Sequence, residues 1–79
     1  MKVVIAKVDE VFFDGEADSL TAPGSDGEMT ILHGHMPLIT TLKVGVLTVR
    51  GKNLPAGRQE FPVQSGVMEV HHDGATVIL

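Results

Sequence analysis

Glycine and proline interrupt the chain at short, nearly regular intervals, and this punctuation limits its possible folds more than any other feature. Between the interruptions lie short segments rich in Val, Ile, Thr and Leu, in which apolar and polar residues alternate. Evenly spaced short strands with turn signals between them are typical of an all-β sandwich or barrel. We therefore predict a two-sheet β-sandwich of about eight to ten short strands, and no segment has the apolar stripe of a helix.

The pattern places strands at residues 2–8, 16–22, 28–32, 38–43, 46–50, 59–64, 67–72 and 75–79. Side chains alternate across a strand, so Met68 and Val70 should face one side and Val67 and Glu69 the other. Asp73-Gly74 then tolerates the backbone angles of a two-residue hairpin turn into the last strand. Residues 51–58, which include two glycines and a proline, are expected to form a long exposed hairpin connection.

The chain length of 79 residues fits one domain, residues 1–79, and leaves no room for a second of ordinary size. A domain of this size buries only about 60% of the surface that its unfolded chain exposes. There is no cysteine, so neither a disulfide nor a thiolate metal site can reinforce it. Docking onto a partner would be one such reinforcement.

Charge and hydropathy exclude several classes of partner. Six Lys and Arg stand against ten Asp and Glu, and the basic residues form no run, whereas nucleic-acid binding needs clustered positive charge. No apolar stretch approaches the ~20 residues that span a bilayer, and the apolar run in residues 1–8 is too short for the core of a signal peptide. We expect neither nucleic-acid binding nor direct membrane insertion.

Residue motifs offer no catalytic site. Gly24-Ser25-Asp26-Gly27 could suggest a phosphate cradle, but Glu28 follows the second glycine where a phosphate-binding loop has lysine. A tight turn between strands is the better interpretation, and no nucleotide binding is expected. The serines lack the surroundings of an activated nucleophile, and the acidic residues between 9 and 18 are interpreted as a solvated edge.

Four histidines raise the question of a metal site. His33 and His35 are two apart and could share one face of a strand, but Gly34 and Pro37 indicate a turn there. His71 and His72 are adjacent, so on a strand they would point to opposite faces. We expect turn or interface histidines, with no metal and no cofactor. A small β-sandwich that carries a ligand or metal on these histidines is the alternative.

Residues 21–40 resemble the hallmark stretch of the epsilon subunit of F-type ATP synthases. That stretch has two glycines three apart, an acidic residue, a short strand with Ile, and Gly-His-x-Pro-Leu, which stands here at residues 34–38. Residues 42–47 resemble the family's Leu-Lys-Pro-Gly segment, residues 65–70 its Gly-Gly-x-x-Glu-Val strand, and residues 75–79 its closing strand. Val44 and Ser65 replace a usual proline and glycine, and His33 stands where proline is common, all in turns, where substitution is tolerated.

The resemblance implies a non-catalytic rotor subunit of the central stalk, which links the gamma subunit to the c-ring and couples proton translocation to ATP synthesis. It further implies a place on the cytoplasmic face of a bacterial inner membrane. Carried over by position, Asp26, Gly27 and Glu28 would face the c-ring. The gamma-subunit interface would consist of His35, Met36, Pro37 and Leu38. Family members commonly continue into C-terminal helices that inhibit ATP hydrolysis, and because the sequence ends at Leu79 we do not expect that activity here.

Overall fold

The computed structural model describes all of residues 1–79 and consists of nine strands and one short 3₁₀ turn. The strands are β1 (Lys2–Lys7), β2 (Glu10–Glu16), β3 (Ser19–Gly24), β4 (Gly27–Leu32), β5 (Leu38–Leu42), β6 (Gly45–Arg50), β7 (Arg58–Val63), β8 (Gly66–His71) and β9 (Gly74–Ile78). The 3₁₀ turn η1 (Pro55–Gly57) lies in the connection between β6 and β7, which is the predicted hairpin loop. No helix is long and apolar enough to cross a bilayer.

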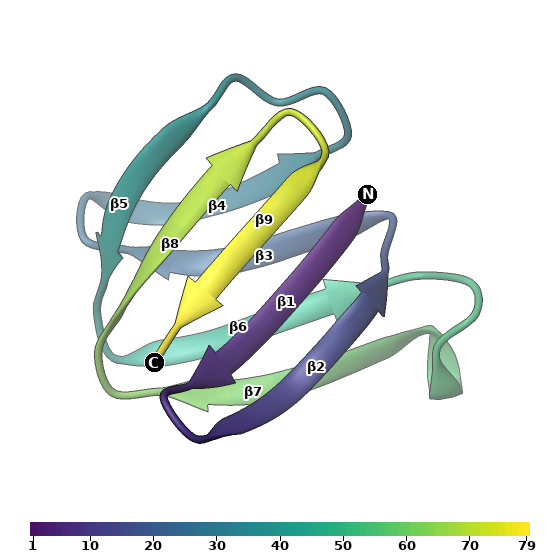
Figure 1. Ribbon diagram of the computed structural model, residues 1–79, viewed down its shortest axis with the longest axis horizontal. Helices are drawn as coiled ribbons and strands as arrows, with labels where there is room; N and C mark the ends of the chain where they lie inside the picture. Colours follow the sequence, from purple (N-terminus) through teal and green to yellow (C-terminus); the bar gives the residue numbers. More distant parts are fainter.

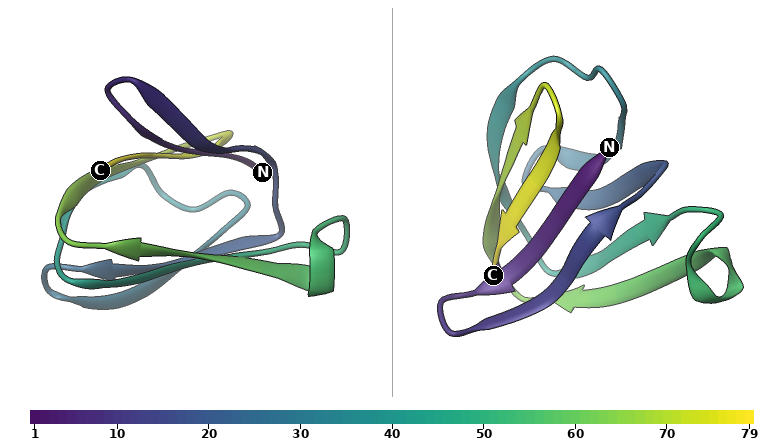
Figure 2. Two further views of the ribbon diagram at one scale, coloured as in Figure 1. Left: turned by 90° about the horizontal axis from the view of Figure 1, so that it is seen from below. Right: turned by 45° about the vertical axis from the view of Figure 1, so that its right-hand side comes forward.

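The strands form two layers that face each other (Figures 1 and 2). Hydrogen-bonded neighbours follow the order β2-β1-β9-β8-β5-β3-β6-β7, with β4 beside β3. Only one residue pair, Gly24 with Leu42, joins β3 to β5. The order therefore divides there into a five-stranded layer, β2-β1-β9-β8-β5, and a four-stranded layer, β4-β3-β6-β7. The predicted all-β sandwich is confirmed.

The first and last strands lie side by side in the middle of the five-stranded layer. Residues 2–6 of β1 pair with residues 74–78 of β9, and this is the one parallel pairing in the fold. Because the two strands run in the same direction, the termini lie at opposite ends of the sandwich (Figure 1).

The core fills the space between the layers with aliphatic side chains from both. Ile5, Leu20, Ile31, Leu47 and Met68 are at most 1% exposed. Complete burial of one such side chain stabilises a fold by about 1.5–3 kcal/mol. The prediction for β8 is confirmed, since its Met68 and Val70 are buried and its Val67 and Glu69 exposed. On one open side, Phe13 of β2 meets Phe61 of β7 edge to face, with ring centroids 6.1 Å apart.

The acidic residues between 9 and 18 form a solvated edge, as predicted, but the strand that carries most of them, β2, was missing from the predicted strands. Glu10, Asp14 and Glu16 are exposed, whereas Phe12 and Phe13 between them pack against the core, and the segment pairs with β1 along its length. The pairing shifts by one residue, since Ile5 pairs with Phe13 and Ala6 with Val11. This β-bulge breaks the alternation from which a strand is recognised in a sequence.

The last hairpin turn also differs from the prediction by one residue. His71 pairs with Gly74, so the two turn residues are His72 and Asp73, and Gly74 begins β9. Gly74 has a φ of +156°. A Cβ atom there would overlap the carbonyl oxygen of Lys2 and lie 2.9 Å from the Lys2 nitrogen. Glycine is therefore required by the close approach of β1 in addition to its backbone angles.

Candidate partner-binding surfaces

The tight turn between β3 and β4 presents two carboxylates at one end of the sandwich. Ser25 and Asp26 form the turn between the paired residues Gly24 and Gly27, as predicted. The amide of Ser25 donates to the carbonyl oxygen of Thr41 at 3.0 Å, which ties the turn to β5. The Asp26 and Glu28 side chains are exposed. The structure thus places the predicted Asp26, Gly27 and Glu28 on one projecting corner.

Other turns at the same end add apolar side chains to this corner. The register aligns the β3–β4 turn with the turns β1–β2, β5–β6 and β7–β8 and with the chain's last residue (Figure 1). Val8 is 100% exposed in the first of these and Val44 is 73% exposed in the second. Exposed valines beside carboxylates are typical of a surface that a partner covers. We call this end the acidic end.

The loop between β4 and β5, residues 33–37, lies at the opposite end of β4. The ring Nδ1 of His35 lies 2.8 Å from the carbonyl oxygen of Met36, and the His35 amide donates to Leu32 at 3.1 Å. Met36 is 78% exposed, and Pro37 is also exposed. His35 thus holds its own loop together while its neighbours face solvent. His35, Met36 and Pro37 are thus separated from the acidic end by the length of β4.

A hollow between β4 and β5 is the place where the two predicted sets meet. It has a volume of about 380 Å³ and opens where the two layers separate beyond the Gly24–Leu42 junction. Its walls contain Asp26, Gly27 and Glu28 from one predicted set and Leu38 from the other. His35, Met36 and Pro37 do not reach it.

The histidines do not form a metal centre. No three His, Cys, Asp or Glu side chains converge on a common point. His71 Nε2 lies 3.5 Å from the hydroxyl of Thr76, while His33 and His72 lie in separate turns. Nothing in this arrangement supports the alternative of a metal carrier.

An apolar row on the outer face of the five-stranded layer was missed in the sequence. Val11, Val67 and Ile78 are 63%, 43% and 50% exposed, and the pairing aligns them across β2, β8 and β9. Ile39, which is 71% exposed, lies on the same face of β5 but opposite Glu69, two residues from Thr41, which pairs with Val67. The sequence did contain a sign of this row, because residues 67–70 and 75–79 have apolar side chains on both faces of their strands. The outer face of the other layer is more polar, with Thr21 bonded to Thr30 at 3.1 Å and to Arg50 at 3.3 Å, although Leu32 and Val46 are also exposed there.

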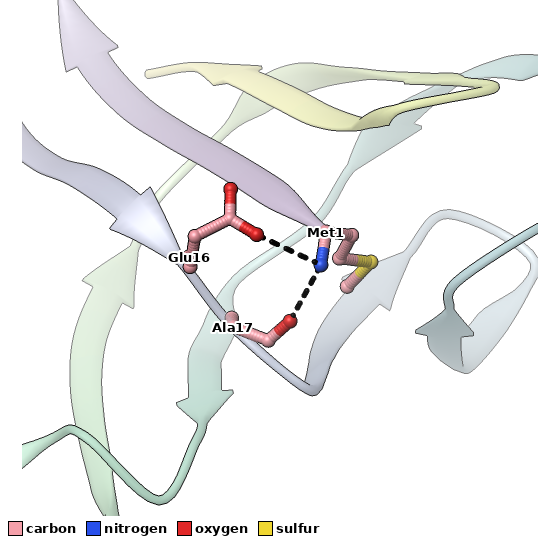
Figure 3. Close-up of polar contacts among 3 residues, drawn as sticks. All are labelled: Met1, Glu16 and Ala17. Atoms are coloured by element: carbon pink, nitrogen blue, oxygen red, sulfur yellow. Dashed lines mark hydrogen bonds and ion pairs between the residues drawn. The ribbon is translucent and has the colours of Figure 1, made fainter.

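The amino group of Met1 fastens the beginning of β1 to the segment that follows β2 (Figure 3). It donates to the carbonyl oxygen of Ala17 at 2.9 Å and lies 3.4 Å from a Glu16 carboxylate oxygen. In return the Ala17 amide donates to the Met1 carbonyl at 2.8 Å. The contact extends the β1–β2 pairing past its last ladder residues.

We expect one residue added before Met1 to lower the free energy of unfolding by about 1 kcal/mol, because the Met1 nitrogen becomes an uncharged amide that still donates to Ala17 but forms a weaker bond. Urea denaturation of the two chains measures the difference. Glu16→Gln is the matched control and should change stability by less than about 1 kcal/mol, since the Glu16 side chain is 73% exposed. Equal stability of the extended and original chains would contradict a stabilising role for the amino group.

Comparison with known proteins assigns a family to this arrangement. The family model described as ATP synthase, Delta/Epsilon chain, beta-sandwich domain, matches residues 1–79. The chain is 40% identical over 79 residues to the ATP synthase epsilon chain of Herminiimonas arsenicoxydans, covering 99% of this chain and 55% of the relative. It is 37% identical over 70 residues to that of Parvibaculum lavamentivorans, covering 89% of this chain and 52% of the relative. The chain therefore spans about half the length of these relatives.

Solved structures share the fold. A chain in the mitochondrial ATP synthase of Euglena gracilis, in a structure of OSCP, F1 and c-ring, superimposes with a TM-score of 0.83 at 23% identity, over 96% of this chain and 48% of that one. A chain in the central stalk and c-ring of the Tetrahymena thermophila enzyme gives a TM-score of 0.74 at 22% identity, over 98% and 60%.

Proposed function

The chain belongs to the family of ATP synthase delta/epsilon chain β-sandwich domains, and on this premise we propose that it is a non-catalytic part of the central-stalk rotor. In this proposal it links the gamma subunit to the c-ring, so that proton translocation is coupled to ATP synthesis. It works on the cytoplasmic face of a bacterial inner membrane, which it reaches through its partners. The observation that carries the proposal is the family match over residues 1–79.

The separation of the two candidate surfaces supports a linking role. The acidic end and the β4–β5 loop lie at opposite ends of β4. One partner could therefore be held at each end without competition. Between them lies a core in which the largest side chains are at most 1% exposed, and a close-packed interior transmits strain with little deformation. In the proposal, the acidic end faces the c-ring loops and the β4–β5 loop faces gamma.

A charge reversal at the acidic end tests the ring contact. Exposed Glu28 projects beside Asp26, so Glu28→Lys should weaken binding of the protein to purified c-ring by about tenfold, mainly by slowing association. Surface plasmon resonance at low and high salt measures this, and the difference should shrink at high salt. Glu69→Lys is the control, because it makes the same change of charge at an exposed residue in the middle of β8, away from the acidic end. An equal loss in both variants would show that only net charge matters.

The gamma contact and the rotor role as a whole are tested by reconstitution. Purified protein should capture the cognate gamma subunit, and proton-driven ATP synthesis in vesicles should fall when the protein is left out or carries Glu28→Lys. If the protein binds neither gamma nor c-ring, the proposed function is wrong.

A further inference from the structure

Strand β4 has a free edge with unused backbone groups. It pairs with β3 on one side and with no strand along the other. Pro23 has no N–H and pairs with Glu28, so Pro23 and Glu28 form one of the residue pairs that exchange no hydrogen bonds between β3 and β4. Such positions alternate along an antiparallel pair. The N–H and C=O groups of Glu28 and Thr30 therefore point away from β3, along the free edge.

Of the other three edge strands, β2 and β7 are protected against pairing and β5 is protected only at its end. Strand β2 has a bulge and three exposed carboxylates. Strand β7 has Pro62 opposite Val46 and an ion pair of 3.6 Å between Arg58 and Glu60. On β5 one edge group is occupied, since the Thr41 carbonyl oxygen accepts from both the Ser25 amide and the Ser25 hydroxyl at 3.0 Å. Bulges, prolines and charges are the usual means of blocking an edge.

Strand β4 has a single charge at Glu28 and, at its end, one occupied carbonyl, since the Leu32 oxygen accepts from the His35 amide at 3.1 Å. Its remaining residues, Met29 to Leu32, are apolar apart from Thr30, and Leu32 is 57% exposed. Beside it lies the hollow of about 380 Å³, whose apolar walls are Met29 and Leu38. Both side chains are only partly buried, although they pack against the core. The edge of β4 thus borders a hollow that has apolar walls at Met29 and Leu38, carboxylates at Asp26 and Glu28, and room for further side chains.

We propose that the free edge of β4 is a strand-addition site for an extended segment of another protein of the ATP synthase complex. The added segment continues the four-stranded layer and satisfies the N–H and C=O groups of Glu28 and Thr30. Apolar side chains at its alternate positions enter the hollow over Met29 and Leu38, and a Lys or Arg lies near Asp26 and Glu28. The inference rests on the proposed function for the source of this segment.

The geometry favours a strand over a helix as the occupant. A helix satisfies its own backbone groups internally and would leave those of β4 without partners when it covered them. An extended chain satisfies both sets at once. A second copy of this chain, paired through β4, is the competing occupant. A dimer of the purified protein in sedimentation analysis that is lost on Thr30→Pro would identify that occupant and overturn the proposal.

Hydrogen exchange tests the proposal directly. Amide exchange is measured for the protein alone and assembled in the ATP synthase complex, with a readout that resolves β4. The amides of Glu28 and Thr30 are expected to exchange at least tenfold more slowly in the complex. If the protein assembles and these amides exchange as fast as in the free protein, the strand-addition site is wrong while the proposed function stands. If the protein does not assemble at all, the proposed function itself fails.

Two substitutions of Thr30 distinguish binding through the backbone of β4 from binding through its side chains. Thr30→Pro removes an edge N–H that makes no bond to β3, and proline is tolerated at such edge positions. Thr30→Val keeps the N–H and the branched shape. We expect Thr30→Pro to assemble at least tenfold less efficiently than the parent protein and Thr30→Val to assemble normally, with thermal unfolding of both isolated proteins as the check on folding. Equal assembly of a folded Thr30→Pro protein would overturn the proposal.

Discussion

Gly74→Ala should be the most damaging single-methyl change in the protein, with a loss of at least about 3 kcal/mol of unfolding free energy, a large part of the stability of a small domain. The added Cβ would overlap the carbonyl group of Lys2, and the φ of +156° is unfavourable for any residue with a side chain. Relief requires β1 to move away from β9, which would disrupt the middle of the five-stranded layer. Circular dichroism during urea titration measures the effect.

Gly15→Ala provides the control for this substitution. Gly15 lies in the same layer, in the edge strand β2, and a Cβ there would meet its nearest neighbour, a Phe13 ring atom, at an ordinary 3.6 Å. Its stability should stay within about 1 kcal/mol of the parent protein. If Gly74→Ala proves as mild as Gly15→Ala, then β1 and β9 are not as close as described.

Met68→Ala should have the next largest effect, a loss of about 2–5 kcal/mol, because it opens a cavity in the core. Met68 is fully buried in β8, between Thr40 of β5 and Val77 of β9. Equilibrium urea denaturation measures the change, with the slope of the transition as a check that unfolding remains two-state.

Two controls define what Met68→Ala reports. Met68→Leu conserves volume and should cost less than about 1.5 kcal/mol. Val67→Ala removes apolar atoms from the adjacent residue, whose side chain is 43% exposed on the opposite face, and should cost less than about 1 kcal/mol. If all three variants lose similar stability, burial on the inner face of β8 does not determine the outcome.

The fold was largely predictable because its strands alternate cleanly between glycine and proline turns. The inner and outer faces of β8 followed directly from this alternation. Strand β2 was missed because the bulge beside Ile5 and Ala6 disturbs the alternation and because its exposed carboxylates resemble a solvated loop. The last turn lies one residue earlier than predicted. Gly74 is required by its close approach to Lys2, a residue far away in the sequence, and does not belong to the turn.

Only part of the candidate site, the exposed corner, could be predicted from the sequence. The exposed corner at Asp26 and Glu28 followed from local turn chemistry and from the family resemblance. The free edge of β4 depends on the order of the strands, which no local pattern contains. The same holds for the hollow, because it brings Leu38 to the corner across the gap between two layers. Contacts that depend on how sheets are assembled require the structure.

The parallel pairing of β1 with β9 has a mechanical consequence. A pull that separates the two ends of this domain acts along both strands in opposite directions, since the termini lie at opposite ends of the sandwich. The hydrogen bonds between residues 2–6 and 74–78 are then loaded in shear and must yield together. In a hairpin pulled open from its ends, such bonds break one after another under a smaller force. The domain should therefore resist a force that pulls its N- and C-termini apart.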